Sequence, residues 1–335
     1  HASAAATDLM ISLDQLEVAL PNVKSVSLVA SWFGSDLRAE HCLIRPGAEH
    51  ATKITSPESW SVNGIDRTSA TVVSLDAEDH PAYGGTPADF TIVQAIKELK
   101  ARGKRVTFYP FLLMDIPAGN GLPDPYSDNA ATTGQPAYPW RGRITCSPAA
   151  GFVGTVDKTA AAGDQVAAFF GNAQASDFSV SGETVSWTGG ADWGYRRFIL
   201  HYAHLCAAAG GVDAFLIGSE LRGLSQIRDG ATSYPAVAAL KQLAADVANL
   251  VTIATGLYRI PVDFTDLVLV PYPGDTPPGV LESTAPTWES WNAPSPAVTT
   301  GTIDTSGTNN RTLYKCFDLI AAGVSAVDID AGNVT

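Results

Sequence analysis

Residues 25–34, Ser-Val-Ser-Leu-Val-Ala-Ser-Trp-Phe-Gly, form an apolar run without a single charged side chain. A strand that carries no charge on either face is typical of a sheet buried on both faces, and such sheets are usually parallel. Parallel neighbours cannot be joined by a tight turn, so the chain needs a long crossover between them, most often a helix. This run therefore predicts an α/β fold.

Residues 86–115 have the pattern of such a crossover. Apolar side chains recur at helical spacing from Ile92 to Leu99, with Thr86 as the expected N-cap, and Gly103 ends the helix. An apolar strand over 105–115 follows almost at once, which completes half of a βαβ unit. Further helices are expected over residues 159–170, 192–207 and 235–250, strands over 70–75 and 212–217, and a surface hairpin over 178–187.

The strand expected at 212–217 ends at Gly218-Ser219-Glu220. In a β/α barrel the carboxyl ends of all strands open at one mouth, where catalytic acids sit. The ends at Trp32, Asp76, Asp115 and Glu220 are therefore expected to share it. Glu220 also fits a role as a helix cap or as a surface ion-pair partner of Arg222 or Arg228, and Asp115 fits ordinary turn chemistry before Ile116-Pro117.

Two carboxylates at one mouth are what glycoside hydrolysis requires, one to protonate the leaving oxygen and one to attack or to activate water. Glu220 and Asp115 are the candidate catalytic residues. Aromatic and cationic side chains near the mouth are candidates for substrate binding: Trp32, Tyr138, Trp140, Trp193 and Arg222. Core packing is an equally good explanation for the tryptophans.

The composition excludes several other classes. The chain has 335 residues and a formal net charge of −13, which disfavours a nucleic-acid partner and favours a neutral ligand such as a glycan. It contains no GxSxG, P-loop or GxGxxG motif, so neither a serine hydrolase nor a nucleotide cofactor is expected. No apolar run reaches 18 residues, so no membrane span is expected.

No metal or other cofactor is expected. His201 and His204 stand at helical i, i+3 spacing, but no third ligand is near them in the sequence, so they are interpreted as hydrogen-bonded residues of one helix face. The cysteines are widely separated and are interpreted as free thiols, with one disulfide left open. A start at His1 instead of Met indicates part of a longer chain, or a processed or tagged one.

The alternation of helix and strand ends near residue 250. Residues 251–335 carry strand-like runs and a stretch rich in Pro, Thr, Ser and Gly. The expected division is a barrel-type domain over 1–250 and a β-rich segment of unknown role over 251–335.

Several segments resemble the glycoside-hydrolase-type TIM-barrel domain of the large baseplate protein of gene transfer agents and related tailed phages. The similarity covers residues 9–250 and rests on these motifs: Ser27-Leu-Val-Ala-Ser-Trp-Phe-Gly, Tyr83-Gly-Gly-Thr-Pro, residues 105–120, Tyr138-Pro-Trp-Arg-Gly-Arg-Ile-Thr-Cys, Asp192-Trp-Gly-Tyr-Arg-Arg-Phe, His201-Tyr-Ala-His and Phe215-Leu-Ile-Gly-Ser-Glu-Leu-Arg-Gly-Leu. The resemblance implies a (β/α)8 barrel at the tail tip of a virion, acting at the host cell surface. Implied partners are other baseplate proteins, further copies of this chain and host surface glycan.

The resemblance also implies that Glu220 is the general acid/base of a retaining glycosidase. Ser219 stands where that clan usually has Asn, and residues 251–335 contain no counterpart of the strand that supplies the nucleophile. The barrel is thus completed by sequence elsewhere, replaced by another domain after 250, or incomplete. Three functions stay open: a structural, glycan-binding baseplate module, an active retaining glycoside hydrolase, and a free-standing hydrolase.

Overall fold

The computed structural model describes residues 7–56, 58–255, 259–263 and 316–320. Its central sheet has the strand order β10-β7-β1-β2. Strands β1 (Ser25–Gly34) and β7 (Arg105–Met114) are parallel and paired along their whole length. The short strand β10 (Ala214–Phe215) continues the sheet in parallel on the other edge of β7, and β2 (Ile44–Arg45) pairs antiparallel with the end of β1.

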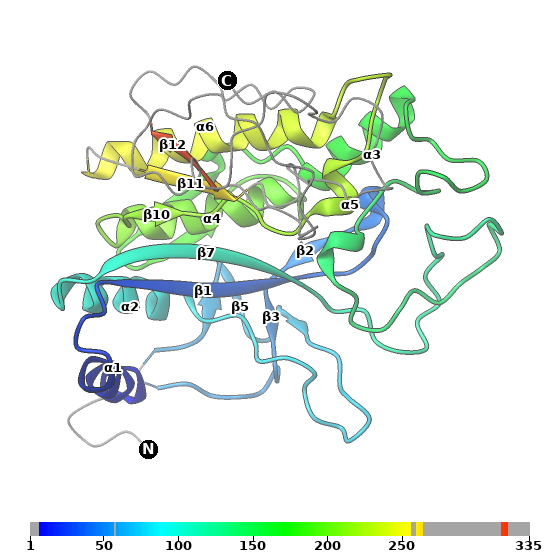
Figure 1. Cartoon of the computed structure of the whole chain (residues 1–335). Helices are drawn as coiled ribbons and strands as arrows, with labels where there is room; N and C mark the ends of the chain where they lie inside the picture. The colour runs from blue at the N-terminus through cyan, green and yellow to red at the C-terminus, as the bar shows by residue number, and fades with distance from the viewer. Residues whose placement is uncertain (1–6, 57, 256–258, 264–315, 321–335) are drawn as a thin grey trace, which may run out of the picture.

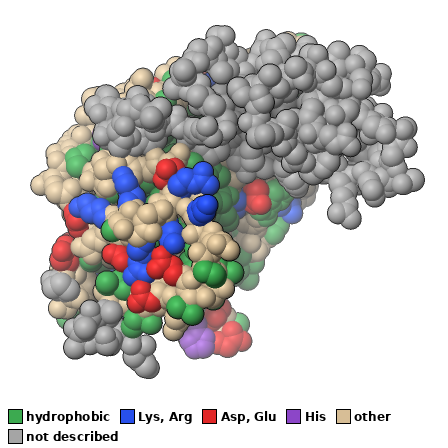
Figure 2. Space-filling view, turned by 60° about the vertical axis from the view of Figure 1, so that its left-hand side comes forward, with side chains coloured by type: hydrophobic (Ala, Val, Ile, Leu, Met, Phe, Trp, Pro, Cys, Tyr) green, Lys and Arg blue, Asp and Glu red, His purple; other side chains and the backbone are tan. Residues whose placement is uncertain are grey.

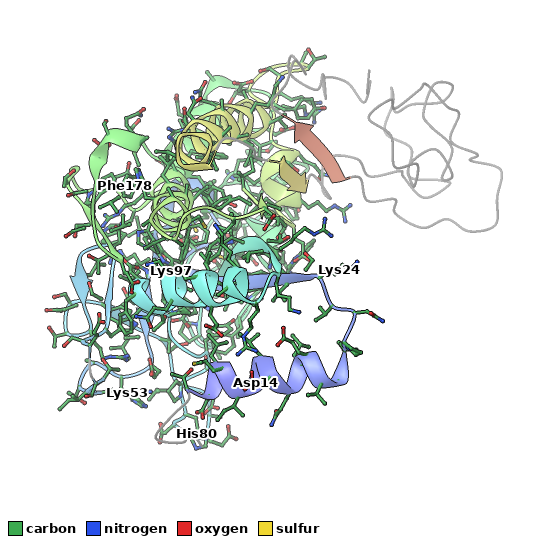
Figure 3. The ribbon with its side chains drawn as sticks, turned by 90° about the vertical axis from the view of Figure 1, so that its left-hand side faces the viewer. Asp14, Lys24, Lys53, His80, Lys97 and Phe178 are labelled. Carbon is green, nitrogen blue, oxygen red and sulfur yellow. The ribbon has the colours of Figure 1, made fainter. Side chains whose placement is uncertain are left out.

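Helices connect the parallel strands in chain order. Helix α2 (Asp89–Ala101) lies between β1 and β7, α4 (Tyr195–Ala208) between β7 and β10, and α6 (Pro235–Thr255) follows β10. Figure 3 looks onto the amino ends of the strands and shows α2, α4 and α6 one above the other, with α1 (Asp8–Ala19) at the bottom. Sequential parallel strands with their helices along one side are the arrangement found in part of a β/α barrel.

The helix-facing side of the sheet forms the core. Burial alternates along β7, where Val106, Phe108, Leu112 and Met114 are buried and the residues between them are partly exposed. The ring of Phe108 packs against Tyr202 of α4 at a centroid distance of 5.1 Å. The structure confirms the strands expected at 25–34 and 105–115. It also confirms the helices expected at 159–170, 192–207 and 235–250, with ends that differ by a few residues.

The described residues do not form a closed barrel, so the (β/α)8 architecture that the resemblance implies is not complete in them. The central sheet stays open, with β2 on the outer edge of β1. Strands β11 (Arg259–Asp263) and β12 (Cys316–Ile320) pair antiparallel with each other in the expected β-rich segment. A further strand-like run of that segment, residues 267–272, lies outside the described residues. Helix α6 runs across the expected boundary at 250 to Thr255.

Long excursions leave the carboxyl ends of the strands, which lie toward the right of Figure 1. The excursion after β1 contains η1 (Ala39–His41), β3 (Gly47–Ala48), β4 (Ser61–Val62), β5 (Ile65–Asp66) and β6 (Thr71–Val72). The excursion after β7 contains η2 (Arg141–Arg143), α3 (Ala160–Phe170), η3 (Ala175–Asp177) and the expected hairpin β8 (Phe178–Ser181) and β9 (Thr184–Trp187). After β10 the short α5 (Arg222–Ser225) leads to α6. These excursions are where a barrel carries its site.

Two expectations in the first excursion are wrong. The run at 70–75 does not join the central sheet, because its residues Thr71–Val72 pair with β3. Asp76 therefore does not follow a strand of the central sheet, and its carboxylate accepts hydrogen bonds from the backbone of Glu78 and His80 in its own turn. A short apolar run predicts a strand but not its partner. Thr86 is not the N-cap of α2 either, since its hydroxyl donates to the Ser31 carbonyl.

The face seen in Figure 2 mixes basic and acidic side chains. Arg102 forms ion pairs with Asp14, Glu17 and Glu98 at 2.7–3.0 Å near the amino ends of the strands. Cys42, Cys146 and Cys206 are free and buried, and burial raises the pKa of the Cys42 thiol to about 12. Among the described helices, none combines the length and the hydropathy needed to cross a membrane.

Candidate functional site

Glu220 projects from the loop that follows β10. Its backbone has a φ of 54°, in the left-handed region that non-glycine residues rarely adopt. The loop begins at a fixed point, because the Tyr195 hydroxyl donates to the Ile217 carbonyl at 2.9 Å. The Glu220 side chain is 48% exposed. Backbone strain of this kind clusters at functional sites, so the conformation favours a functional reading of Glu220.

The two carboxylate oxygens of Glu220 differ in their surroundings. Oε2 accepts a hydrogen bond from the indole Nε1 of Trp140 at 2.8 Å and lies 2.8 Å from a guanidinium nitrogen of Arg141. Oε1 has no partner among the described residues. One oxygen is thus held by a hydrogen bond and an ion pair, while the other remains available to a ligand on this exposed side chain.

Arg141 lies behind Glu220 and is buried. Its Nε donates to the Ser219 carbonyl at 3.0 Å, and its terminal nitrogen donates to the Ser219 hydroxyl at 2.9 Å and to the Tyr109 hydroxyl at 3.3 Å. The guanidinium also stacks on the ring of Phe111, 3.9 Å from its centroid. Tyr109 and Phe111 belong to β7, so Arg141 connects the loop of Glu220 to the neighbouring strand.

Asp115 follows β7 directly, as expected, but both of its oxygens are occupied. The Ser74 backbone donates to Oδ2 at 3.0 Å, and the Ser74 hydroxyl donates to Oδ1. The Ser74 hydroxyl also lies 3.2 Å from the Tyr138 hydroxyl. Burial, together with the nearby Asp115 and Tyr138, raises the pKa of Tyr83, whose hydroxyl donates to the Met114 carbonyl. Asp115 therefore fastens the first excursion to the end of β7.

One short segment reaches both candidate acids. Tyr138 contacts Ser74, the partner of Asp115, while Trp140 and Arg141 contact Glu220. The Tyr138 backbone also has a positive φ of 46°, which turns the chain sharply just before these residues. The excursion after β7 thus contacts the residues around both strand ends.

The predicted substrate-binding residues do not lie together in the structure. Trp140 is 46% exposed and lies beside Glu220. Trp32 is fully buried against Phe198 of α4 at a centroid distance of 5.4 Å, so the prediction that it contacts substrate is wrong. Large aromatic residues suit a core and a glycan site equally, and the sequence could not separate the two. Arg222 is exposed at the start of α5, and the arginine that pairs with Glu220 is Arg141.

Trp193 lines a different hollow, a cavity of about 410 Å³ beside the β8–β9 hairpin. Trp187, Asp177, Asp192 and Glu40 also line it, and Glu220 does not. The guanidinium of Arg197 lies 3.6 Å from the Trp193 centroid and 4.5 Å from the Trp187 centroid. This cation already covers a face of each ring, so the cavity offers less aromatic surface to a ligand than Trp140 does.

A buried polar network joins α2, α4 and the first excursion. His201 Nε2 lies 3.0 Å from Asp89 Oδ1, and Asn63 Nδ2 lies 3.0 Å from His201 Nδ1. Arg197 Nε donates to Asn63 Oδ1 at 2.7 Å, which assigns the amide and leaves His201 Nδ1 as an acceptor. Burial lowers the pKa of His204, whose ring contacts the Ala175 carbonyl. Both histidines thus have hydrogen-bond partners, as predicted, and the described residues contain no cluster of three metal-ligating side chains.

Sequence reasoning missed Arg141, Ser219 and Tyr109 as site residues. The only signal for Arg141 was its position after Tyr138-Pro-Trp in a long loop. In sequence, a basic pair such as Arg196-Arg197 on α4 is typical of a solvated face or of a carboxylate-binding site. Both are buried, and Arg196 binds Asp246 at 2.6 Å.

Comparisons with known proteins bear on the segment that presents Glu220. Residues 193–260 match the sequence model of the GTA TIM-barrel-like domain, and this stretch contains α4, β10, α5 and α6. The search of curated proteins found no match. The complex structure of a GH113 beta-1,4-mannanase is similar at 12% identity and a TM-score of 0.33, over 76% of this chain and 50% of that chain, a likeness too low to carry an argument about the site. The chain therefore contains a TIM-barrel-like segment, similar over residues 193–260 to the GTA TIM-barrel-like domain, in which Glu220 follows strand β10.

Proposed function

We propose that the carboxyl end of the sheet is a glycan-binding site of the glycoside-hydrolase type, in a baseplate component that engages glycan on the host cell surface. One observation carries the proposal. The exposed indole of Trp140 is hydrogen-bonded to Glu220, whose other carboxylate oxygen has no partner among the described residues.

A sugar ring has an apolar face and hydroxyl groups around its edge. An exposed indole supplies a flat apolar surface, and an open carboxylate oxygen accepts hydrogen bonds from hydroxyls. A ligand site of this kind combines an apolar surface with a few fixed polar groups. The net charge of −13 makes a neutral polymer a better ligand than a phosphate-rich one.

The tail-tip location is part of the proposal. It rests on the motif resemblance described above and on the match of residues 193–260 to the GTA TIM-barrel-like domain. Other baseplate proteins and further copies of this chain are the proposed partners in the particle. Immunogold labelling of particles with antibody against this chain tests the location: label at the tail tip supports it, and particles without label contradict it.

Hydrolysis by a retaining mechanism is the second candidate, with Glu220 as acid/base. The observation that favours it is the asymmetry of the carboxylate, because an acid/base needs one oxygen free to reach the glycosidic oxygen. Asp115, with both oxygens bound to Ser74, is a poor nucleophile. A second carboxyl about 5–5.5 Å from Glu220 is required for this mechanism.

The test uses the full chain with a panel of cell-wall and capsular glycans. Binding is measured by calorimetry and hydrolysis by the release of reducing ends, with Glu220→Gln as the variant and Glu40→Gln, an exposed carboxylate elsewhere, as the control. Binding that weakens only in Glu220→Gln supports the glycan site. Reducing ends that are released by the wild type and lost in Glu220→Gln establish hydrolysis. No binding to any glycan contradicts the proposed function.

A further inference from the structure

We propose that Arg141 is the positioning residue that holds Glu220 in its working conformation, an inference that rests on the proposed function of Glu220. No feature of the sequence assigned this role. The burial of Arg141, its contacts and the backbone that carries it all favour this role.

The Arg141 side chain is buried much more deeply than the carboxylate that it contacts. Its side chain is only 6% exposed, whereas that of Glu220 is 48% exposed. A typical exposed ion pair contributes little, because both side chains are mobile and screened by water. A buried guanidinium with several hydrogen bonds is different, since its planar fork is already ordered before the carboxylate arrives.

Arg141 binds the residue before Glu220 as well as Glu220 itself. It contacts the carbonyl and the hydroxyl of Ser219, and the Ser219 hydroxyl is hydrogen-bonded to Tyr109 of β7. The strained backbone at Glu220, with its φ of 54°, therefore has a partner that fixes both the peptide before it and the carboxylate after it. Strain persists only where the surroundings over-determine it, and Arg141 provides that constraint.

The backbone around Arg141 is itself held from both sides. An added Cβ on Gly223 would lie 2.6 Å from the Ile144 carbonyl oxygen and 2.9 Å from that of Gly142, so α5 packs directly on this segment. On the other side the Thr145 amide donates to the Leu37 carbonyl at 2.9 Å. The backbone that carries Arg141 is thus fixed on two sides, by α5 and by the excursion after β1.

The experiment follows the indole N–H of Trp140, which reports on Glu220 without any glycan. A ¹H–¹⁵N spectrum of the full chain has one indole resonance for each of its 7 tryptophans, and Trp140→Phe assigns the one at the site. The position of the resonance is compared in the wild type, in Arg141→Met and in Arg141→Lys. The matched control is Arg143→Met, because Arg143 lies in the same turn and stacks on Tyr126.

If Arg141 positions Glu220, Arg141→Met moves the Trp140 resonance, because the carboxylate that accepts the indole hydrogen bond loses the partner that holds it in place. Arg141→Lys, which keeps the charge but not the planar fork, also moves the resonance, because an ammonium cannot bind Ser219 and Glu220 in the same geometry. Arg143→Met leaves the resonance unchanged. An unchanged resonance in Arg141→Met and Arg141→Lys overturns the inference, and so does an equal change in Arg143→Met.

The glycan assays separate this inference from the proposed function. When the wild type binds glycan, Arg141→Met is expected to lower the affinity, or kcat/KM if the glycan is cleaved, by roughly 100-fold, the effect of a misplaced functional group. Arg143→Met is expected to lower it less than about 3-fold. If the wild type binds no glycan, the proposed function fails, while the position of the Trp140 resonance still decides whether Arg141 positions Glu220.

Discussion

The indole nitrogen of Trp140 lies 2.8 Å from Oε2 of Glu220. This contact joins the excursion after β7 to the loop after β10, so an exposed aromatic ring and an open carboxylate form one surface. Each group alone is common on proteins. Their pairing at the carboxyl ends of parallel strands is the reason for proposing a glycan as the ligand.

Trp140→Ala is expected to weaken glycan binding by at least about 10-fold, because it removes both the stacking surface and a hydrogen bond to Glu220. Calorimetry with the full chain measures the effect. Tyr234→Ala is the matched control, since Tyr234 is also an exposed aromatic residue, at 37%, and has no contact with the site among the described residues. Equal affinity of Trp140→Ala and the wild type would show that Trp140 does not contribute to glycan binding.

Gly223→Ala is expected to disturb the site from outside it. The new Cβ would meet two backbone carbonyls, and backbone cannot yield as a flexible side chain does. The segment carrying Trp140 and Arg141 is therefore pushed away from Glu220, and the Trp140 indole resonance shifts. Gly84→Ala is the control, because an added Cβ there meets no atom within 4 Å. The prediction fails if the resonance stays in place in a folded Gly223→Ala protein.

Asp89→Ala is expected to lower the free energy of unfolding by about 3 kcal/mol. The change leaves the His201 ring and the backbone amides of Asn63 and Val185 without their buried acceptor. Urea unfolding at pH 7 measures it. His80→Ala, at a 76% exposed side chain, is expected to change the value by less than about 0.5 kcal/mol. Similar values for the two variants would show that the network contributes nothing.

Glu49 makes the first excursion sensitive to acid. Its partial burial acts to raise the pKa, but hydrogen bonds from Lys53 and Arg67 outweigh burial and lower the pKa from 4.5 to about 2. A carboxyl with a depressed folded pKa stabilises the protein above pH 4.5, and this contribution is lost as the pH falls from 4.5 toward 2.

The Glu49→Gln variant should therefore lose less stability than the wild type between pH 6 and pH 3. The expected difference is about 1 kcal/mol after discounting for solvent screening. Urea unfolding at the two pH values provides the measurement, and Glu58→Gln, an exposed acid in the same excursion, serves as the control. Parallel pH profiles for the wild type and Glu49→Gln would contradict the assignment.

Local sequence patterns predicted the parts of the fold that depend on local interactions. The charge-free run at 25–34 and the helix–turn–strand pattern at 89–114 became β1, α2 and β7. The pairing of 71–72 with β3 was not predictable, because a short apolar strand can pair with many partners. Closure of the barrel, expected from the resemblance, is not found among the described residues.

The sequence predicted the acids of the candidate site but not their partners. Glu220 and Asp115 follow strands, so strand periodicity located both. Their partners are distant in sequence: Arg141 lies 78 positions from Ser219, and Ser74 lies 41 positions from Asp115. Proximity in sequence instead suggested Arg222 or Arg228 as the partner of Glu220. Only the path of the long excursions decides which side chain meets which acid.

The most direct test of the central claim is a titration of the full chain with a glycan that it binds, followed on the tryptophan indole resonances. The account predicts that the Trp140 resonance shifts with the glycan concentration, while those of Trp187 and Trp193, which line the cavity beside the β8–β9 hairpin, stay in place. Shifts of Trp187 and Trp193 with an unmoved Trp140 would contradict it, because the glycan would then occupy that cavity and not the surface at Glu220.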